Sequence, residues 1–206
     1  MDVKIPKATA RRLPLYYRCL VGLQSEGVER VSSTELSQAL QIDSASIRRD
    51  FSYFGALGKR GYGYDVPKLL SFFKQLLNQD QLENVALVGV GNMGRALLNY
   101  NFKRTNNIRI SCAFDVDETI TNRIVSGIPI YEIGDLEKQI QDQEISIAIL
   151  AVPAAVAQKT AEKLYEAGIR GIMNFTPTRL QLPAEVKLQN VDLATELQTL
   201  IYFLNN

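Results

Sequence analysis

Histidine and tryptophan are absent from this 206-residue sequence, and cysteine occurs only twice. Histidine is the commonest general base and the commonest transition-metal ligand, so its absence argues against histidine-dependent catalysis and against most metal sites. Cys19 and Cys112 are too few for a disulfide framework or a thiolate metal site. We therefore expect no metal ion and no catalytic residue, and we assign both cysteines to buried packing.

Long apolar runs are also missing. No stretch approaches the roughly 18 uninterrupted apolar residues of a membrane-spanning helix, and the N-terminal segment lacks the apolar core of a signal peptide. Hydrophobic residues make up 46% of the chain and charged residues 22%, which is ordinary for a globular protein with a sizeable core. These values predict a cytoplasmic protein.

The net charge of +1 conceals an uneven distribution along the chain. Residues 1–68 contain 11 Lys and Arg against 7 Asp and Glu, whereas the remainder contains 12 against 15. A positive N-terminal part is typical of a surface that faces a polyanion.

The most informative segment is VALVGVGNMG at residues 85–94, where an apolar strand runs into glycines and then into a helix. Gly89 permits a tight turn, Gly91 lets the backbone approach a pyrophosphate, and Gly94 lets the helix pack closely on the strand. The helix N-terminus then presents free N–H groups to phosphates. The predicted phosphate-binding loop comprises Gly89, Val90, Gly91, Asn92, Met93 and Gly94.

A second predicted strand, residues 108–114, ends in Asp115, which lies 21 residues beyond Gly94. An acid at this distance is expected to hold the ribose 2′-hydroxyl of the adenosine, and its charge would repel a 2′-phosphate. The pattern therefore predicts NAD(H) as the cofactor in preference to NADP(H). The alternative is a Rossmann-like domain in which the glycines only form a turn.

The N-terminal part predicts four helices, of which the second and third are joined by a tight turn. The fourth is the amphipathic segment KLLSFFKQLLN, which Asp65 and Pro67 open. The first is expected to begin at Pro14, because proline fits the first turn of a helix. Ser32 and Glu35 form a capping-box pattern before TELSQAL, and Asp43 or Ser44 can cap SASIRRDFSYF. This order is typical of a helix-turn-helix.

In the second helix of this pair, Ile47 and Phe51 are spaced to face the core, which leaves polar side chains on the other faces. The glycine-rich segment GALGKRGYGYD then predicts a basic hairpin with Lys59 and Arg60 at its tip. Together they predict a winged helix, with the helix in the major groove of DNA and the wing on the backbone or minor groove. The predicted DNA-binding residues are Ser46, Arg48, Arg49, Ser52, Lys59, Arg60 and Gly61.

Two alternatives remain for this part of the chain. The helices could form a small protein-interaction bundle whose arginines are solvated. The glycine-rich segment could be a second phosphate-binding loop, although it lacks the pattern GxxxxGK[ST].

After residue 80, strands and helices alternate, and strands such as ISIAILAV are apolar on both faces, which predicts a doubly wound parallel sheet of the Rossmann-like α/β class. The C-terminal segment VDLATELQTLIYFLNN predicts a helix with a wide apolar face, so we expect another subunit to cover it. We place a winged-helix domain at residues 1–80, a dinucleotide-binding domain at 81–190 and a dimerisation helix at 191–206, with a polar linker over 78–84.

Nearly the whole chain resembles Rex, a family of bacterial redox-sensing transcriptional repressors. The resemblance rests on IPKATARRLPLYYR, IRRDFSYFGALGKRGYGY, VGVGNMGRALLNY, AFDVD, NFTP and VDLATELQTLIYFL. It implies a homodimer that exchanges its C-terminal helix, binds palindromic operator DNA and is released from DNA by NADH, whereas NAD⁺ releases DNA poorly or competes with NADH. It also implies an ion pair between Arg18 and Asp192 of opposite subunits, although both could be ordinary surface residues.

The distinction between the two oxidation states has an independent physical basis. Oxidised nicotinamide is a cation and reduced nicotinamide is neutral, so an apolar cavity disfavours the oxidised ring through desolvation. A difference in affinity between two states is what a ligand-driven switch requires. The candidate lining residues are Tyr100, Val152, Pro153, Phe175 and the partner's Leu193.

Two other functions share parts of this pattern. An NAD-dependent oxidoreductase needs a proton donor near the hydride, but the chain has no histidine and no suitable YxxxK pair. A coenzyme A-binding domain has a similar glycine loop, but Asp115 and the basic N-terminal part argue against it.

Overall fold

The computed structural model describes residues 5–55, 57–59, 61–100 and 107–205. The chain divides into two compact units, an N-terminal unit (Met1–Gln81) and a C-terminal unit (Leu82–Asn206). The polar segment between them is shorter than the sequence suggested, because strand β4 already begins at Glu83. Each unit has its own hydrophobic core.

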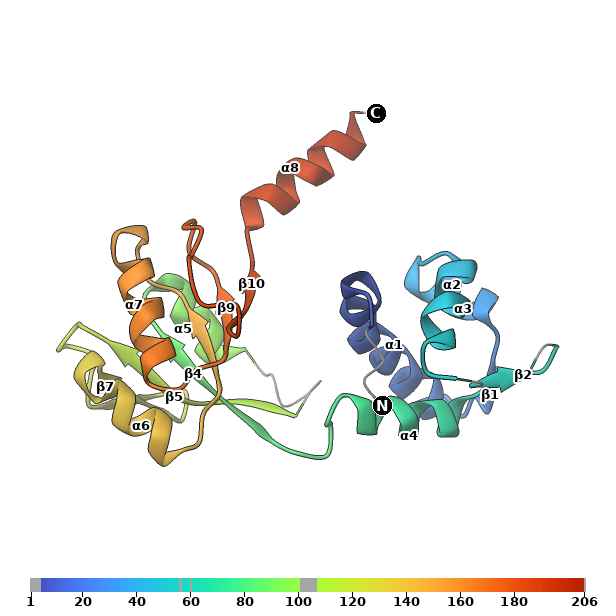
Figure 1. Ribbon diagram of the computed structural model, residues 1–206, viewed down its shortest axis with the longest axis horizontal. Helices are drawn as coiled ribbons and strands as arrows, with labels where there is room; N and C mark the ends of the chain where they lie inside the picture. The colour runs from blue at the N-terminus through green and yellow to red at the C-terminus, as the bar shows by residue number, and fades with distance from the viewer. Residues whose placement is uncertain (1–4, 56, 60, 101–106, 206) are drawn as a thin grey trace. The chain divides into compact units, whose positions relative to one another are not determined.

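The N-terminal unit combines four helices with a small antiparallel sheet of strand order β1-β3-β2 (Figure 1). The predicted capping box at Ser32 and Glu35 is confirmed, and Asp43 caps the next helix by accepting a hydrogen bond from the Ser46 amide. The predicted hairpin is formed by β2 and β3. The elements are α1 (Lys7–Ser25), β1 (Arg30–Val31), α2 (Ser33–Leu40), α3 (Ser44–Ser52), β2 (Gly58–Lys59), β3 (Gly63–Asp65) and α4 (Val66–Leu76).

The start of the first helix was predicted wrongly. Helix α1 begins at Lys7, after Pro6, and Pro14 lies inside it. Proline in a helix interior removes a backbone hydrogen bond and is costly by itself. Here Leu13 and Tyr16 on either side of Pro14 are buried in the core, so tertiary packing overrides the local preference.

The core of the N-terminal unit is rich in aromatic rings. The rings of Tyr16 and Phe51 meet edge to face with centroids 5.1 Å apart, and the Phe73 ring lies 5.5 Å from that of Phe51. These contacts join α1, α3 and α4, so the position of α3 is fixed by the helices on both sides of it in the sequence.

The C-terminal unit is built on one seven-stranded sheet of order β10-β9-β8-β4-β5-β7-β6. All neighbouring strands are parallel except the edge pair β6 and β7. The elements are β4 (Glu83–Val88), α5 (Asn92–Asn99), β5 (Ile108–Asp115), β6 (Arg123–Val125), β7 (Ile128–Glu132), η2 (Ile133–Asp135), α6 (Leu136–Asp142), β8 (Ile147–Leu150), α7 (Ala154–Glu166), β9 (Gly171–Asn174), β10 (Lys187–Asn190) and α8 (Leu193–Leu204).

Two strands of this sheet, β6 and β10, were not predicted. Both lie at an edge of the sheet, and the sequence of β10, KLQN, is mostly polar. A strand with only one neighbour does not need the apolar pattern of a central strand, so hydrophobic periodicity gives no signal there.

Helices cover the two faces of the sheet unequally. Helices α6 and α7 pack on one face, where alternate strand residues such as Ala148 and Leu150 join them in the core. Helix α5 packs on the other face with Ile149 and its neighbours. On this second face Ile147 and Met173, in β8 and β9, each remain 37% exposed. The sheet therefore has an uncovered apolar strip beside α5.

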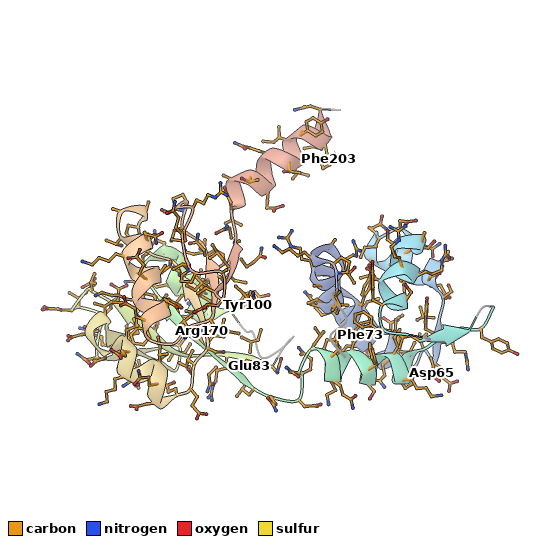
Figure 2. All side chains as sticks on the ribbon, in the orientation of Figure 1. Asp65, Phe73, Glu83, Tyr100, Arg170 and Phe203 are labelled. Atoms are coloured by element: carbon orange, nitrogen blue, oxygen red, sulfur yellow. The ribbon has the colours of Figure 1, made fainter. Side chains whose placement is uncertain are left out.

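Helix α8 follows β10 and has no buried residue. Figure 2 shows the side chains along it, including that of Phe203, which is 71% exposed. Seven of its large apolar residues are exposed, namely Leu193, Leu197, Leu200, Ile201, Tyr202, Phe203 and Leu204.

Candidate functional site

A cavity of about 770 Å³ lies at the carboxyl ends of β4, β5, β8 and β9. The chain leaves β4 toward β5 on one side, and β8 lies on the other side of β4. Ligands of open α/β sheets bind at such a reversal of strand order, outside the carboxyl ends of the strands. The volume is within the range of about 300–1,000 Å³ that small-molecule sites occupy.

Seven residues predicted to bind the cofactor line this cavity. They come from four segments that are distant in the sequence, at or just after the carboxyl ends of β4, β5, β8 and β9, and the parallel sheet brings these segments to one edge. The seven are Gly89, Gly91, Met93, Asp115, Val152, Pro153 and Phe175.

The three glycines of the loop differ in what a Cβ at each position would meet. Gly89 has φ +95°, and a Cβ there would collide with the carbonyl oxygen of Ala151. A Cβ on Gly94 would collide with the carbonyl oxygen of Gly89, whereas one on Gly91 would meet nothing within 4 Å. Gly91 therefore leaves open space beside the N-terminus of α5, as a site that admits a phosphate requires.

The other two residues of the loop, Val90 and Asn92, connect it to the core and to α5. The side chain of Val90 is buried in the core under α5. Asn92 is the first residue of α5, and Arg95 in the same helix donates from Nε to the carbonyl oxygen of Val90 at 3.2 Å.

The Asp115 carboxylate joins the end of β5 to the glycine loop. Its Oδ2 accepts a hydrogen bond from the Val90 amide at 2.6 Å. Its Oδ1 accepts from the amides of Val116 and Asp117 at 2.7 and 3.0 Å. Asp115 thus holds the loop in place as well as lining the cavity, a role that sequence spacing did not predict.

Tyr100 and Leu193 do not line this cavity in the single chain. Tyr100 follows α5 (Figure 2), is 60% exposed, and borders a separate cavity of about 590 Å³ next to Arg109. Leu193 opens α8 and is 55% exposed. Leu193 was predicted to contact the cofactor of the partner subunit. The predicted cofactor contacts of Tyr100 and Leu193 both stay predictions.

Several lining residues were missed by the sequence analysis. Val116 follows Asp115, and Ile133 follows β7, so both belong to strand ends. Val88 and Phe114 lie at the carboxyl ends of β4 and β5, and Ala151 directly follows β8. The remaining four lie on α7, where only the core-facing side was recognisable from periodicity. The missed set is Val88, Phe114, Val116, Ile133, Ala151, Val156, Lys159, Thr160 and Lys163.

The predicted DNA-binding residues of α3 lie on its solvent side. Arg48, Arg49 and Ser52 are exposed and Ser46 is half-buried, whereas Ile47 and Phe51 are buried as predicted. Arg48 donates to the Ser33 hydroxyl at 3.3 Å. A groove of about 510 Å³ separates α3 from the hairpin, and its walls include Arg48, Ser52, Gly61 and Gly63.

The orientation of α3 depends on a buried carboxylate that the sequence analysis did not single out. Asp50 is 1% exposed. It accepts hydrogen bonds from Nε and Nη2 of Arg12 at 2.6 and 2.7 Å, from Tyr16 at 2.5 Å and from Thr9 at 2.8 Å. All three donors lie on α1, so this network fastens α3 to α1.

Burial by itself raises the pKa of Asp50, but the hydrogen bonds from Arg12, Tyr16 and Thr9 outweigh it and hold that pKa below its usual value. Burial, followed by the hydrogen bond to Asp50, raises the pKa of Tyr16. The acid is therefore ionised at neutral pH and fully paired.

The hairpin has a contact that was also missed. Arg30 in β1 lies over the ring of Tyr62 at 5.8 Å from its centroid and donates to the Tyr62 carbonyl oxygen at 3.2 Å. Lys59 lies in β2 opposite Gly63. Gly61 is exposed with φ +82°. Arg60, predicted at the tip, lies outside the described residues.

The two residues of the predicted intersubunit ion pair are both on the surface. Arg18 is exposed on α1. Asp192 caps α8 by accepting from the amides of Ala194 and Thr195 at 3.0 and 3.3 Å and from the Thr195 hydroxyl at 2.8 Å. These bonds, first that of the Thr195 side chain, lower the pKa of Asp192. The ion pair itself stays a prediction.

The two cysteines are both free thiols, and they lie in different units. Cys112 is fully buried, and burial raises its pKa to about 11. Cys19 is half-buried, and burial raises its pKa as well. In the part of the chain that the structure describes, no group of three His, Cys, Asp or Glu side chains could hold a metal ion. No helix among these residues is long and apolar enough to cross a membrane.

Two family descriptions match the chain. Residues 4–52 match a family described as putative DNA-binding protein N-terminus, and residues 80–178 match one described as CoA binding domain. The first match ends with α3, and the second contains the glycine loop and the cavity.

Full-length relatives and solved structures cover both units. The redox-sensing transcriptional repressor Rex of Lactobacillus acidophilus is 71% identical over 204 residues, which are 99% of this chain and 97% of that protein. The crystal structure of RSP in complex with β-NAD⁺ and operator DNA has a TM-score of 0.90 at 36% identity and covers 98% of this chain and 93% of that one. RSP in complex with β-NADH has a TM-score of 0.87 at 34% identity, with coverage of 98% and 95%.

Proposed function

From the membership of this chain in the Rex family of redox-sensing transcriptional repressors, we propose that it represses transcription by binding operator DNA as a homodimer and leaves the DNA when NADH fills the cavity. The resemblance found in the sequence is thereby confirmed. The family consists of repressors, so the chain is a regulator and not an oxidoreductase.

One observation carries the proposal: a single chain combines a cavity at the strand reversal with a helix-turn-helix and hairpin. Gly89, Gly91 and Asp115 meet at that cavity in the arrangement that dinucleotide recognition requires. Arg48 and Arg49 stand exposed on α3, where they can donate to guanine or to phosphate. Neither unit needs chemistry at a substrate to perform its task.

The nature of the cavity wall explains how oxidation state can be sensed. Val152, Pro153 and Phe175 present apolar surface to the cavity. A wall of this kind disfavours a cationic ring through desolvation and tolerates a neutral one. We therefore assign the preference for NADH over NAD⁺ to these three residues. The glycine loop and Asp115 bind parts of the dinucleotide that do not change between the two forms.

Two exposed surfaces support the homodimer. Helix α8 exposes a wide apolar face, and the sheet leaves an apolar strip at Ile147 and Met173 uncovered. Exposed apolar surfaces of this extent typically belong to an interface. We propose that α8 of each subunit covers the strip of the other, which would bring Tyr100 and the partner's Leu193 toward the cofactor. An ion pair between Arg18 and the partner's Asp192 would then depend on the arrangement of the subunits.

The same reasoning assigns the three parts of the chain. Residues 1–80 bind DNA, residues 81–190 bind NAD(H), and residues 191–206 dimerise. Because a bacterial repressor acts on the chromosome, we place the protein in the cytoplasm.

The proposal is tested by the binding of a labelled palindromic DNA library at several NADH/NAD⁺ ratios. We expect the bound fraction to fall as the ratio rises, with NAD⁺ acting as a weak competitor of NADH. Phe175→Asp should reduce the preference for NADH, because a carboxylate favours the cationic ring. A ratio-independent bound fraction, or an unchanged preference in Phe175→Asp, would contradict the proposal.

The match to the CoA binding domain description calls for a second measurement. Thermal denaturation with NADH, NADPH or coenzyme A compares the three ligands, because a ligand that binds the folded state raises the melting temperature. We expect the largest shift with NADH. A larger shift with coenzyme A would replace the proposed ligand.

A further inference from the structure

Asn174 ends strand β9 and is fully buried with all of its amide groups in use. Its Oδ1 accepts from the amide and the hydroxyl of Thr176 at 3.0 and 2.7 Å. Its Nδ2 donates to the carbonyl oxygen of Thr178 at 3.0 Å and to Oδ1 of Asn190 at 2.9 Å. The proposed function gives no task to this residue.

On one side, these bonds reach the wall of the cavity. Phe175 is the next residue and lines the cavity, and its amide donates to the carbonyl oxygen of Leu150 at 2.9 Å. The Thr178 hydroxyl donates to the carbonyl oxygen of Ala154 at 3.4 Å. Ala154 is the first residue of α7 and follows Pro153. The loop that Asn174 holds therefore carries Phe175, and it bonds to the residue that follows Val152 and Pro153, the rest of the apolar wall.

On the other side, the bonds reach the residues that lead into α8. Asn190 is the last residue of β10, and the Val191 amide donates to the Asn174 carbonyl oxygen at 2.9 Å. Asp192, the cap of α8, comes next. Strand β10 is at the edge of the sheet and pairs only with β9, so its carboxyl end has few other restraints.

We propose that Asn174 is a positioning residue that couples the occupation of the cavity at Phe175 to the direction in which α8 leaves β10. The inference rests on the proposed function. A buried amide whose partners are all satisfied resists the loss of any one bond. A displacement of the loop at Thr176 and Thr178 is thus passed to Asn190 through a single side chain. The displacement reaches Asn190, which is exposed and ends β10. Only Val191 separates Asn190 from Asp192, the cap of α8.

Asn190 offers a sharper test than Asn174 itself, because loss of the buried amide could prevent folding. Asn190→Ala removes the acceptor on β10 and leaves the bond of Asn174 to Thr178. Asn190→Asp keeps an acceptor oxygen and should behave like the wild type. Asn84→Ala is the matched control: the Asn84 Oδ1 accepts two bonds from Arg109 at 3.2 and 2.8 Å at the amino end of β4, so a comparable polar contact is lost away from the cavity.

The readout is the ratio of operator dissociation constants with and without saturating NADH, measured on the full-length protein. We expect this ratio to fall roughly 3- to 10-fold in Asn190→Ala, as for a residue that carries coupling between sites. NADH affinity, measured by nicotinamide fluorescence, and operator affinity without nucleotide should stay within about twofold of wild type. Hydrogen exchange at residues 191–195 should respond to NADH in the wild type and in Asn190→Asp, but not in Asn190→Ala.

The outcomes separate the inference from the proposed function. A wild-type ratio in Asn190→Ala, or an equal loss in Asn84→Ala, overturns the coupling role and leaves the repressor intact. A loss in Asn190→Ala that Asn190→Asp does not restore also overturns it, since the acceptor oxygen is then not the cause. A wild-type protein whose operator binding ignores NADH overturns the proposed function and this inference with it.

Discussion

The N-terminal unit fixes helix α3 with a buried charge, whereas the C-terminal unit places its cavity by the ends of its sheet strands. Asp50 is fastened to α1 by three side chains, and it is the one charged residue that is buried among those the structure describes. In the C-terminal unit the cavity is formed where four strands of one sheet end. A helix is free to rotate or slide unless side chains hold it, but a strand is positioned by its neighbours. The two units therefore differ in which substitutions can disable them.

The largest effect is expected at the buried carboxylate. Asp50→Ala leaves the partly exposed Arg12 guanidinium and the buried hydroxyls of Thr9 and Tyr16 without their acceptor, and each buried donor left unpaired costs about 1–3 kcal/mol of unfolding free energy. Operator binding should be lost while NADH binding persists, as checked by thermal denaturation and nicotinamide fluorescence. Asp43→Ala, which removes only the exposed cap of the same helix, should have a smaller effect. Equal losses in the two variants would contradict the comparison.

The same carboxylate predicts a pH dependence. Because the pKa of Asp50 is lower in the folded than in the unfolded state, its contribution is complete above the unfolded value of about 4 and is lost as the pH falls toward the folded value. Urea denaturation between pH 7 and pH 3 should show this loss in the wild type. Asp50→Asn should flatten the acid limb of the curve.

Removal of residues 193–206 should give the next largest effect. The truncated chain is expected to be monomeric and to bind a palindromic operator at least about 100-fold more weakly, because two correctly spaced reading helices are required. Sedimentation gives the mass, and the N-terminal unit should keep its folding transition. A truncated protein that sediments as a dimer would contradict the assignment of α8.

Substitution of Asp115 tests the cavity of the C-terminal unit. Asp115→Ala removes both the predicted ribose acceptor and the acceptor of the Val90 amide. We expect NADH affinity to fall about tenfold and the preference against NADPH to narrow. Asp117→Ala, which removes a neighbouring exposed carboxylate that bonds to Thr119, is the control. Unchanged affinity for both nucleotides in Asp115→Ala would end this assignment.

A smaller effect is expected at the DNA-binding surface. Arg48→Ala should weaken binding selectively for the preferred operator by about 1–3 kcal/mol, whereas Lys59→Ala should weaken all sequences evenly and lower the salt slope by about one unit. Titrations at several salt concentrations separate the two. Wild-type binding after both substitutions would remove the winged-helix interpretation.

No effect on sensing is expected from the cysteines. The raised pKa values of Cys19 and Cys112 keep both thiols protonated at neutral pH, and a protonated thiol is a poor target for oxidation. Cys19→Ser with Cys112→Ala should therefore release operator DNA at the same NADH concentration as the wild type. A folded, DNA-binding double variant that ignores NADH would show that thiol chemistry takes part.

Much of the local structure was determined by the sequence alone. The capping box at Ser32, the cap at Asp43 and the glycine loop depend on side chains a few residues apart, so their geometry follows from local rules. The parallel sheet was predictable for the same reason, because apolar central strands alternate with amphipathic helices. The resemblance to Rex used these same segments.

Other features were decided only by the tertiary structure. Pro14 sits inside α1 because Leu13 and Tyr16 are buried beside it, a stabilisation that no local preference contains. Asp50 meets donors 34 to 41 residues away in the sequence, and Asn174 meets Asn190 across two strands. A polar residue in a sequence gives no sign of such a partner. Burial makes these distant polar contacts obligatory, because an unpaired polar group without water is costly, and burial is a property of the fold.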